Sequence, residues 1–585
     1  MGDLINTMKG VGKRLPLVPA LYYYLCQLPG VALQRGLLLG SERFTAGERD
    51  LMARNQLKWR KLAETNNGSE GKGYVLVDTL VNGLPGFYYS GAIVGKYLSH
   101  LKHRRTLFLI ENFYDTRIKR IIGSYGADGF IALNNPQLMG GGGADGRKIF
   151  RSLRSVEQLL EVEYGGLRIG DLIYDTYLSE TREGTISQLD KEVFRRVLAA
   201  VRLKKFYEAI FKKYDISAVV LRDVVYSRMG LLARVALRHN AEVYVQRPLP
   251  PNIIRVRRYC DLKEIRTYQH RPSKALFDYV FQQHRDEAIS GAEAYLQGRM
   301  NPEVPVQDRV DVWNAYGAGK VVLNRQEISS RLNLDAAKPM AVIMSHALTD
   351  APHANNWQLF RDYLVWLRET LQFARDHPET NWLVKSHPSA GIYHCRQTET
   401  DEIATITRDV ANHTIRQLPA EMSTRSLLEF ADVVLTVCGT AGLEFSCYGI
   451  PCVLAGESPY SGFGFTVEPP AKEAYFRRLG DIKQVKRLTE EQVNRAKVVA
   501  YIYFILLGAE TSFLSPDLLY IGRLSGEMAQ RERERISRQA DPSTDPFYLN
   551  FTRFLDADCQ HLIRYPDFYR SYCDAAKNEG AITRV

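Results

Sequence analysis

The sequence predicts an α/β protein built on doubly wound parallel sheets, and three observations support this prediction. The chain of 585 residues is long enough for two or three domains with hydrophobic cores. From residue 74 onward, short apolar runs alternate with helical patterns, which is typical of strands joined by crossover helices. Residues 431–469 repeat that pattern compactly, as a strand, a glycine turn, a short helix and a second strand.

Composition and charge limit the classes of partner. Hydrophobic residues make up 45% of the chain and charged residues 24%, as in ordinary globular proteins. The formal net charge of +11 favours anionic partners such as nucleotides, acidic glycans or the anionic face of a membrane. The sequence has no zinc-finger, helix-turn-helix or RNP-like aromatic motif, so we expect no nucleic-acid partner. The eight cysteines form no CxxC pair, which fits a reducing cytoplasm without a disulfide framework or a metal site.

We expect residues 1–70 to form a helical extension before the first domain. Pro16, Pro19 and Pro29 interrupt its apolar stretch, so the stretch does not read as one membrane-spanning helix. Two interpretations stay open: an amphipathic element on the inner face of the cytoplasmic membrane, or helices packed against the first domain, which we favour. The expected location is therefore the cytoplasm, with peripheral contact to the membrane as the alternative.

The first predicted domain spans residues 71–330. A run of four glycines within residues 139–145 lacks the Lys-Ser/Thr ending of a phosphate-binding loop, so we expect a flexible loop there. The expected strands are Tyr74–Val81, Thr106–Glu111, Gly129–Leu133, Ala218–Leu221 and Val243–Gln246, with helices over Phe87–Leu101 and around Arg117–Tyr125.

The second predicted domain spans residues 331–520, and a helical tail follows over residues 521–585. Residues 498–507 are apolar but too few to span a bilayer, and a capping pattern at Thr489 and Gln492 predicts a buried helix. The expected strands are Met340–His346, Asn381–Lys385, Val433–Val437 and Cys452–Ala455, with a short helix over Leu443–Tyr448.

Polar side chains gather where three strands of the second domain end. The carboxyl ends of parallel strands meet at one edge of the sheet, where open α/β folds bind their ligands, so we expect a concave polar site. These residues are His346 and Asp350 after the first strand, Lys385, Ser386 and His387 after the second, and Gly439, Thr440, Ala441, Gly442 and Glu444 after the third.

The glycine turn of the third strand predicts a phosphate contact. The N–H groups at the start of the following helix would face an anion, most naturally the phosphate of a nucleotide. Thr440 and Glu444 are four residues apart and share one helix face, which suits Glu444 for the ribose hydroxyls. Taken alone, the turn is equally well explained by packing.

The order of these motifs resembles the C-terminal half of bacterial surface-carbohydrate glycosyltransferases with the GT-B fold. The similarity covers residues 338–470 and is greatest to the capsule and lipopolysaccharide proteins that include the capsule β-Kdo transferases. It rests on Ser345-His346 followed by Asp350, on the segment KSHP, and on ADVVLTVCGTAGLEF with the later GIPCVLAG and YSGFGFT. The resemblance implies two Rossmann-like domains with a cleft between them, and a last helix that crosses back to the first domain.

The resemblance also implies roles for individual residues. It assigns the nucleotide phosphate to His387, and it assigns the donor to the strand-turn-helix with Gly439, Thr440, Gly442 and Glu444. Ser345 stands where the capsule enzymes carry a glutamine, so the motif does not fix the donor sugar. CMP-Kdo is the donor that the resemblance suggests.

We therefore expect a metal-independent glycosyltransferase that uses a nucleotide sugar and no further cofactor. Cationic and N–H groups at Lys385, His387 and the glycine turn would offset the charge of the leaving phosphate. Asp350 is the expected catalytic carboxylate, with a helix cap as its alternative, and His346 is its expected partner or a contact to the donor sugar. The loop with Ser461 is expected to close over the donor, with a simple turn as its alternative.

The first domain is expected to bind the acceptor, a growing polysaccharide or lipopolysaccharide glycan that is either free or lipid-linked. Each candidate is equally explained as part of a solvated helix face or as a cap. The candidates are Glu111, Asp171, Asp175, Arg222 and Asp223.

Three other functions stay open at this point. A teichoic-type polyol-phosphate transferase also uses an HP strand end, and a nucleotide-sugar epimerase shares the two-domain fold but needs no acceptor. A non-catalytic scaffold of polysaccharide assembly would bind no nucleotide.

Overall fold

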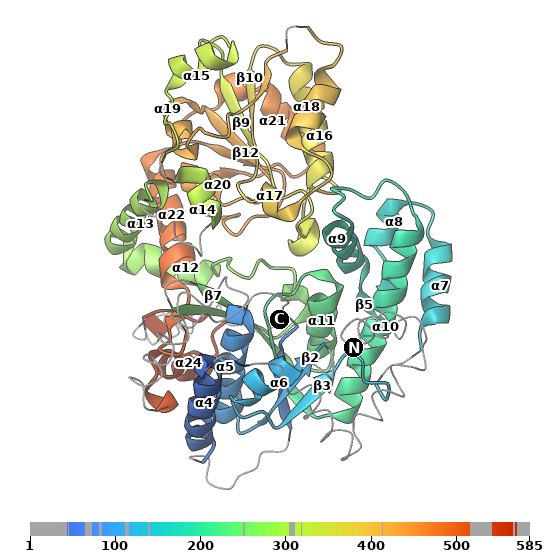
Figure 1. The fold of residues 1–585 in the computed structure, drawn as a ribbon. Coiled ribbons are helices and arrows are strands. Elements are labelled where there is room, and N and C mark those ends of the chain that lie inside the picture. Colours follow the sequence, from blue (N-terminus) through green and yellow to red (C-terminus); the bar gives the residue numbers. More distant parts are fainter. Residues whose placement is uncertain are drawn as a thin grey trace.

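The computed structural model describes most of the chain (Figure 1). No helix within this part is long and apolar enough to cross a membrane. The expected membrane-facing or packed segment before residue 44 and the expected helix over residues 525–540 lie outside it. The described residues are 44, 46–64, 73–80, 85–111, 116–138, 141–249, 252–302, 310–317, 319–411, 413–514, 541–565 and 568–569.

The first sheet has seven strands, five of them parallel neighbours. The chain winds outward from β1 to β3 on one side and continues from β6 to β7 on the other, which places the topological switch point between β1 and β6. The last two strands run antiparallel to their neighbours. In spatial order the strands are β15 (Ala509–Glu510), β8 (Ile253–Tyr259), β7 (Glu242–Leu249), β6 (Ile216–Leu221), β1 (Tyr74–Asp78), β2 (Arg105–Ile110) and β3 (Gly129–Ala132).

Helices cover both faces of this sheet, since its strands are apolar on both sides. One core holds Trp59 and Tyr97 with residues of β1 and β6; the other holds Ile173 and Val197 with the opposite face of the same strands. The first face is covered by α4 (Ala46–Glu64), α5 (Pro85–Leu101) and α6 (Thr116–Gly123), and the second by α9 (Gly170–Thr181), α10 (Lys191–Lys213) and α11 (Leu231–Arg238).

The second sheet has six parallel strands in the order β11-β10-β9-β12-β13-β14. Counted along the chain, this is third, second, first, fourth, fifth and sixth, the order of a Rossmann sheet, with its switch point between β9 and β12. The strands are β9 (Met340–Met344), β10 (Asn381–Lys385), β11 (Ile415–Gln417), β12 (Val433–Thr436), β13 (Cys452–Leu454) and β14 (Thr466–Val467).

Helices also cover the second sheet on both faces. A separate core on one face contains Trp366 and Trp382, and Ile328 and Leu443 lie in the core of the other face. The helices are α16 (Tyr363–Arg375), α18 (Glu399–Thr407) and α21 (Lys472–Gly480) on the first face, and α15 (Arg325–Leu332), α20 (Ala441–Ser446) and α22 (Glu490–Tyr501) on the second.

The chain crosses between the two sheets along one side of the molecule, where α12 (Lys274–Gln283), α13 (Arg285–Met300) and α22 lie (Figure 1). After α22 a π-helical turn, Ile502–Leu506, leads to Gly508 and into β15 of the first sheet. Next, α24 (Pro546–Asp556) packs on α5, and the Tyr97 hydroxyl donates to Asp545 over 3.0 Å. The return to the first sheet thus begins at residue 509, ahead of the expected boundary at 520, and α13 already packs against α22.

Most predicted strands are confirmed to within a few residues, and the capping pattern at Thr489 and Gln492 forms as expected. The flexible loop expected over residues 139–145 is wrong in its second half. Residues 143–145 begin helix α7 (Gly143–Ser152), because Gly142 takes a φ of 126° that turns the chain into the helix. The sequence analysis also missed β8 and β15 of the first sheet and β11 and β14 of the second.

Candidate active site

Side chains from the carboxyl ends of the two sheets meet at Asp350. Asp350 follows β9 of the second sheet, and the hydroxyl of Tyr226, which follows β6 of the first sheet, donates to its Oδ1 over 2.7 Å. The hydroxyl of Tyr393, at the end of the short helix α17 (Ala390–Tyr393) after β10, donates to its Oδ2 over 3.0 Å. Each domain therefore supplies one tyrosine to the same carboxylate, beside both switch points.

The first domain adds charged side chains of both signs beside this contact. Burial raises the pKa of Asp223, the charge of Asp350 raises it further, and Arg222 and Arg247 oppose the shift. The same two arginines lower the pKa of Tyr393 against the stronger effect of its burial, so they lie near the Asp350 cluster. The guanidinium of Arg222 lies 4.3 Å from the ring centroid of Phe87. Of the expected acceptor residues, Arg222 and Asp223 thus lie near Asp350.

Asp78 ends β1 at the switch point of the first sheet, and the sequence analysis missed it. Its side chain is 3% exposed, and the Leu80 N–H donates to its Oδ1 over 3.0 Å. Its Oδ2 has no hydrogen-bond partner among the described residues. Burial raises the pKa of Asp78 to about 6. The signal that could have identified Asp78 is the one used in the second domain, a polar residue at the end of a buried strand.

The contacts of His346 join the end of β9 to the end of β12. Its Nε2 accepts from the N–H groups of Val437 and Cys438 at 3.1 and 3.4 Å, and its ring stacks on Tyr363 with 4.3 Å between centroids. Burial lowers the pKa of His346 to about 3, so the ring is neutral. The hydrogen bonds described for Asp350 come from Tyr226 and Tyr393 and not from His346, so the predicted role of His346, as partner of Asp350 or as a contact to the donor sugar, stays a prediction.

The three polar residues at the end of β10 have different surroundings. Lys385 is 8% exposed, and its Nζ lies 3.5 Å from the Met422 carbonyl. Burial lowers the pKa of Lys385 to about 8, and the nearby charge of Lys320 contributes a smaller part of the shift. Ser386 donates to Glu399 over 3.2 Å. His387 accepts at Nδ1 from the Ser389 N–H over 3.1 Å, which leaves its Nε2 as the N–H donor. Burial lowers the pKa of His387, and Asp350 opposes the shift.

The glycine turn after β12 is partly packed against its neighbours and partly accessible. A Cβ on Gly442 would overlap the Tyr460 hydroxyl and the Cys452 sulfur, so α20 lies against β13 only with glycine here. The Tyr460 hydroxyl donates to the Gly439 carbonyl over 2.5 Å, and the Gly439 N–H donates to the Thr436 hydroxyl over 3.2 Å. Gly439, Thr440 and Ala441 remain half-buried at the edge of the sheet, where a ligand could reach them.

Two predicted donor contacts are replaced by internal contacts. Glu444 is 2% exposed, and its carboxylate binds Arg299 over 3.1 Å and accepts from the Tyr316 hydroxyl over 2.6 Å. Both oxygens thus have internal partners, and the role of Glu444 on the ribose hydroxyls stays a prediction. Ser461 is also buried, and its hydroxyl lies 3.0 Å from that of Ser458. The Ser461 side chain therefore closes a turn rather than facing a donor.

Two other acceptor candidates, Asp171 and Glu111, are paired with arginines of the first domain. Asp171 binds Arg234 through two hydrogen bonds of 2.8 and 2.6 Å and is 1% exposed. It is therefore neither an acceptor contact nor part of a solvated face. Glu111 is partly exposed and lies 3.3 Å from Arg228.

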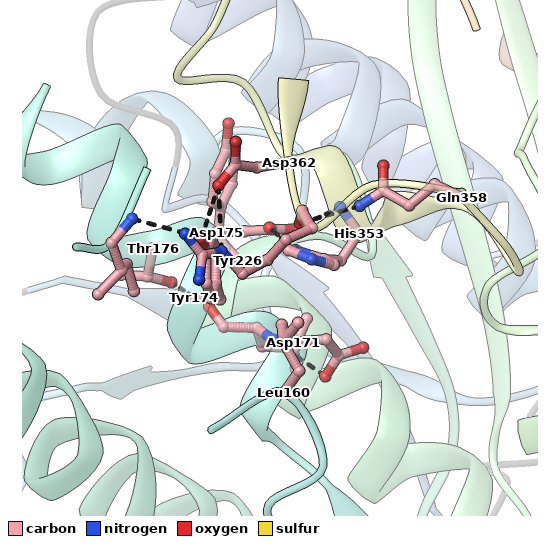
Figure 2. Close-up of polar contacts among 12 residues, drawn as sticks. Leu160, Asp171, Tyr174, Asp175, Thr176, Tyr226, His353, Gln358 and Asp362 are labelled. Carbon is pink, nitrogen blue, oxygen red and sulfur yellow. Dashed lines mark hydrogen bonds and ion pairs between the residues drawn. The ribbon is translucent and has the colours of Figure 1, made fainter. Parts of the chain in front are cut away.

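A second set of contacts joins the domains beside the Asp350 cluster, and Figure 2 shows its members. Asp175 of α9, an expected acceptor residue, binds the Nδ1 of His353 from the second domain over 2.6 Å. The neighbouring Tyr174 donates to Asp362 over 2.6 Å. We name Tyr174, Asp175, His353 and Asp362 the interdomain clasp. No pattern in the sequence predicted the clasp or the two tyrosines of Asp350, because each partner comes from a distant segment.

The described residues contain no group of three or more His, Cys, Asp or Glu that could hold a metal ion. The arrangement instead offers a carboxylate at the domain interface, a neutral imidazole with its N–H available, and a half-buried glycine turn. A site of this kind can take a proton and can bind an anion.

The fold is GT-B-like: two Rossmann-like domains with the carboxyl ends of their sheets facing each other. No family model matches the chain, and no curated protein does. Among solved structures, it is similar to KpsC from Thermosulfurimonas dismutans, a beta Kdo 2,4 transferase, at 15% identity over 48% of this chain and 79% of that one, with a TM-score of 0.29.

Two further solved structures are similar to the chain at comparably low identity. A UDP-N-acetylglucosamine 2-epimerase from Listeria monocytogenes matches at 9% identity over 74% of this chain and 92% of its own, with a TM-score of 0.26. The wall teichoic acid polymerase TagF matches at 9% identity over 85% of this chain and 100% of its own, with a TM-score of 0.21. At these values the likeness carries no argument about activity, which has to come from the site.

Proposed function

We propose that the protein is a glycosyltransferase that takes a sugar from a nucleotide donor bound by the second domain and transfers it to a glycan bound by the first. The observation that carries this proposal is the position of Asp350, a carboxylate between two switch points that accepts a tyrosine hydroxyl from each domain. Ligands of open α/β sheets bind at such points, so two sheets that face each other can bring two substrates together.

In the proposed reaction, Asp350 takes the proton of the acceptor hydroxyl. A carboxylate has about four lone-pair positions, so two tyrosine bonds leave room for that proton. The acceptor oxygen forms a bond to the sugar while the bond from the sugar to the nucleotide phosphate breaks. Lys385, the His387 Nε2–H and the turn at Gly439–Ala441 offset the charge on the leaving phosphate, and the proposal needs no metal ion.

The finer identity rests on the sequence motifs of residues 338–470. They favour a donor of the CMP-Kdo type and an acceptor among capsule or lipopolysaccharide glycans at the inner face of the membrane. The net charge of +11 is consistent with substrates of this acidic kind.

A thermal-shift screen against CMP, UDP, GDP, CDP and their sugars tests the proposal, because a ligand that binds only the folded protein raises its melting temperature. We expect one nucleotide to raise the melting temperature of the wild type and of Asp350→Asn, and not of His387→Ala. Transfer to an acceptor should then be lost in Asp350→Asn and kept in Asp376→Asn, a surface control. No response to any nucleotide would contradict the proposal and favour a scaffold, whereas turnover of the donor without an acceptor would favour an epimerase.

A further inference from the structure

Tyr226 has a backbone conformation that bulky residues rarely adopt. Its φ is 57°, in the left-handed region, and it opens a π-helical turn over Tyr226–Gly230. Left-handed conformations of large side chains persist only where the surroundings hold them, and such residues, like π-helical turns, are concentrated at functional sites.

The turn is fastened to the helices beneath it. The Ser227 N–H donates to the Thr176 hydroxyl of α9 over 2.8 Å, and the Tyr207 hydroxyl of α10 donates to the Arg228 carbonyl over 2.9 Å. At Gly230, an added Cβ would overlap Leu172 of α9 and the Val224 carbonyl. Because α9 and α10 belong to the core of the first domain, the position of Tyr226 is fixed by that domain.

The side chain of Tyr226 leaves its own domain and ends on Asp350. Its hydroxyl donates to Oδ1 over 2.7 Å, while Tyr393, which belongs to the same domain as Asp350, occupies Oδ2. Burial and the charge of Asp350 raise the pKa of Tyr226 far above its usual range, so the phenol stays protonated and remains a donor. Figure 2 shows Tyr226 beside Asp175 and His353 of the interdomain clasp, so the two contacts act on one stretch, residues 350–362.

We propose that Tyr226 is a positioning residue of the acceptor domain that sets the carboxylate of Asp350 when the two domains are closed. The proposal rests on the proposed function for the role of Asp350. Tyr393 alone leaves one oxygen of the carboxylate without a fixed donor, and Tyr226 supplies that donor from the other domain. The site is thus complete only when the first domain, which binds the acceptor, is in contact with the second.

Hydrogen exchange of the full-length protein, followed by mass spectrometry, tests the positioning without any substrate. Tyr226→Phe keeps the ring and removes the hydroxyl. We expect the amides of residues 348–362 to exchange about ten-fold faster, the change that loss of one hydrogen bond to a carboxylate produces in a local opening equilibrium. Asp350→Asn should give a similar change, and the double variant should add little to it.

The control is Tyr164→Phe, which removes another tyrosine-to-aspartate bond, to Asp145 over 2.7 Å, away from the cleft. Its exchange over residues 348–362 should match the wild type. Unchanged exchange in Tyr226→Phe would overturn the proposal, as would equal changes in Tyr226→Phe and Tyr164→Phe.

Kinetics with the donor found in the nucleotide screen separate this proposal from the proposed function. We expect Tyr226→Phe to lower kcat at least ten-fold and to leave the KM for the donor within about two-fold, since the hydroxyl acts on Asp350 and not on the nucleotide. If Asp350→Asn is inactive and Tyr226→Phe is fully active, the positioning role fails and the transferase stands. If Asp350→Asn is fully active, the role of Asp350 fails, and the exchange data still decide whether Tyr226 positions it.

Discussion

At the scale of one residue, Asp78 lies beside the candidate site although its burial lowers the stability of the folded protein. Asp78 is 3% exposed, one carboxylate oxygen has no partner among the described residues, and burial raises its pKa from the usual 3.8 to about 6. A raised pKa in a carboxylic acid means that the folded state disfavours the charged form. The folded protein therefore loses stability as the pH rises from about 4 through about 6.

We predict that Asp78→Asn raises the free energy of unfolding at pH 8. The shift of about two units sets an upper limit of about 3 kcal/mol, and the gain should vanish near pH 4. Urea unfolding at both pH values measures it. A residue kept at such a cost next to a switch point is expected to serve the site, so the stabilised variant should transfer sugar more slowly. A loss of stability at pH 8 would contradict this reading of Asp78.

At the residue scale, the sequence predicted where polar side chains lie but not what they contact. Asp350 and His387 follow buried strands, and parallel strands bring their carboxyl ends together, so their neighbourhood could be expected. Their partners could not. Tyr226 is 124 positions from Asp350, and Arg299 is 145 positions from Glu444, and no local pattern relates residues so far apart.

Helix α20 shows at the scale of an element how one motif can combine a packed face with an accessible turn. Its N-terminal turn is half-buried at the edge of the sheet, whereas its inner face is fixed by Gly442 against β13 and by Glu444 against α13 and α14 (Val310–Tyr316). The buried pair of Glu444 and Arg299 is of the kind whose breaking leaves an uncompensated charge.

We predict that Glu444→Gln lowers the free energy of unfolding by roughly 3 kcal/mol, because Arg299 would stay buried without its counter-ion. The matched control is Glu491→Gln, which breaks the exposed pair of Arg285 and Glu491 on the neighbouring helices and should cost less than about 1 kcal/mol. Denaturant unfolding compares the two. If Glu444→Gln kept wild-type stability and lost only the nucleotide response, this result would contradict the structural role and would support the predicted contact of Glu444 with the ribose.

Elements with a clear apolar pattern could be predicted, and those without one could not. Strand β8 has the sequence IIRVRRY, and its arginines interrupt the apolar pattern that would have predicted a strand. Arg255 and Arg257 are nevertheless buried, because each donates to backbone carbonyls: Arg255 to Leu507 and Tyr503, and Arg257 to Tyr268. Strand β15 has only two residues, too few for any periodicity.

At the scale of the whole molecule, the interdomain clasp makes the domain contact sensitive to pH. Asp175 and the more distant Asp171 and Asp362 raise the pKa of His353 against the effect of its burial, and the ring also packs edge-on to Tyr174. The pair is 7% and 2% exposed, so water screens it little. A folded-state pKa above the unfolded one means that the stabilisation is complete below about pH 6.5 and is lost as the pH rises through the folded-state pKa.

We predict that the difference in melting temperature between the wild type and His353→Gln is largest near pH 6 and becomes smaller toward pH 8.5. Calorimetry across this range, kept above pH 5.5 so that exposed carboxylates stay charged, measures the difference. Tyr177→Phe, which changes another contact of α9, should show no such trend. A difference that grows with pH would contradict the assignment of the pair.

The central claim is that the nucleotide donor lies where the carboxyl ends of the two sheets face each other. A crystal structure with the nucleotide that raises the melting temperature tests it most directly. We predict that the phosphate lies between His387 and the turn at Gly439–Ala441, with the sugar side directed toward Asp350. A nucleotide bound away from the ends of β10 and β12 would contradict the account.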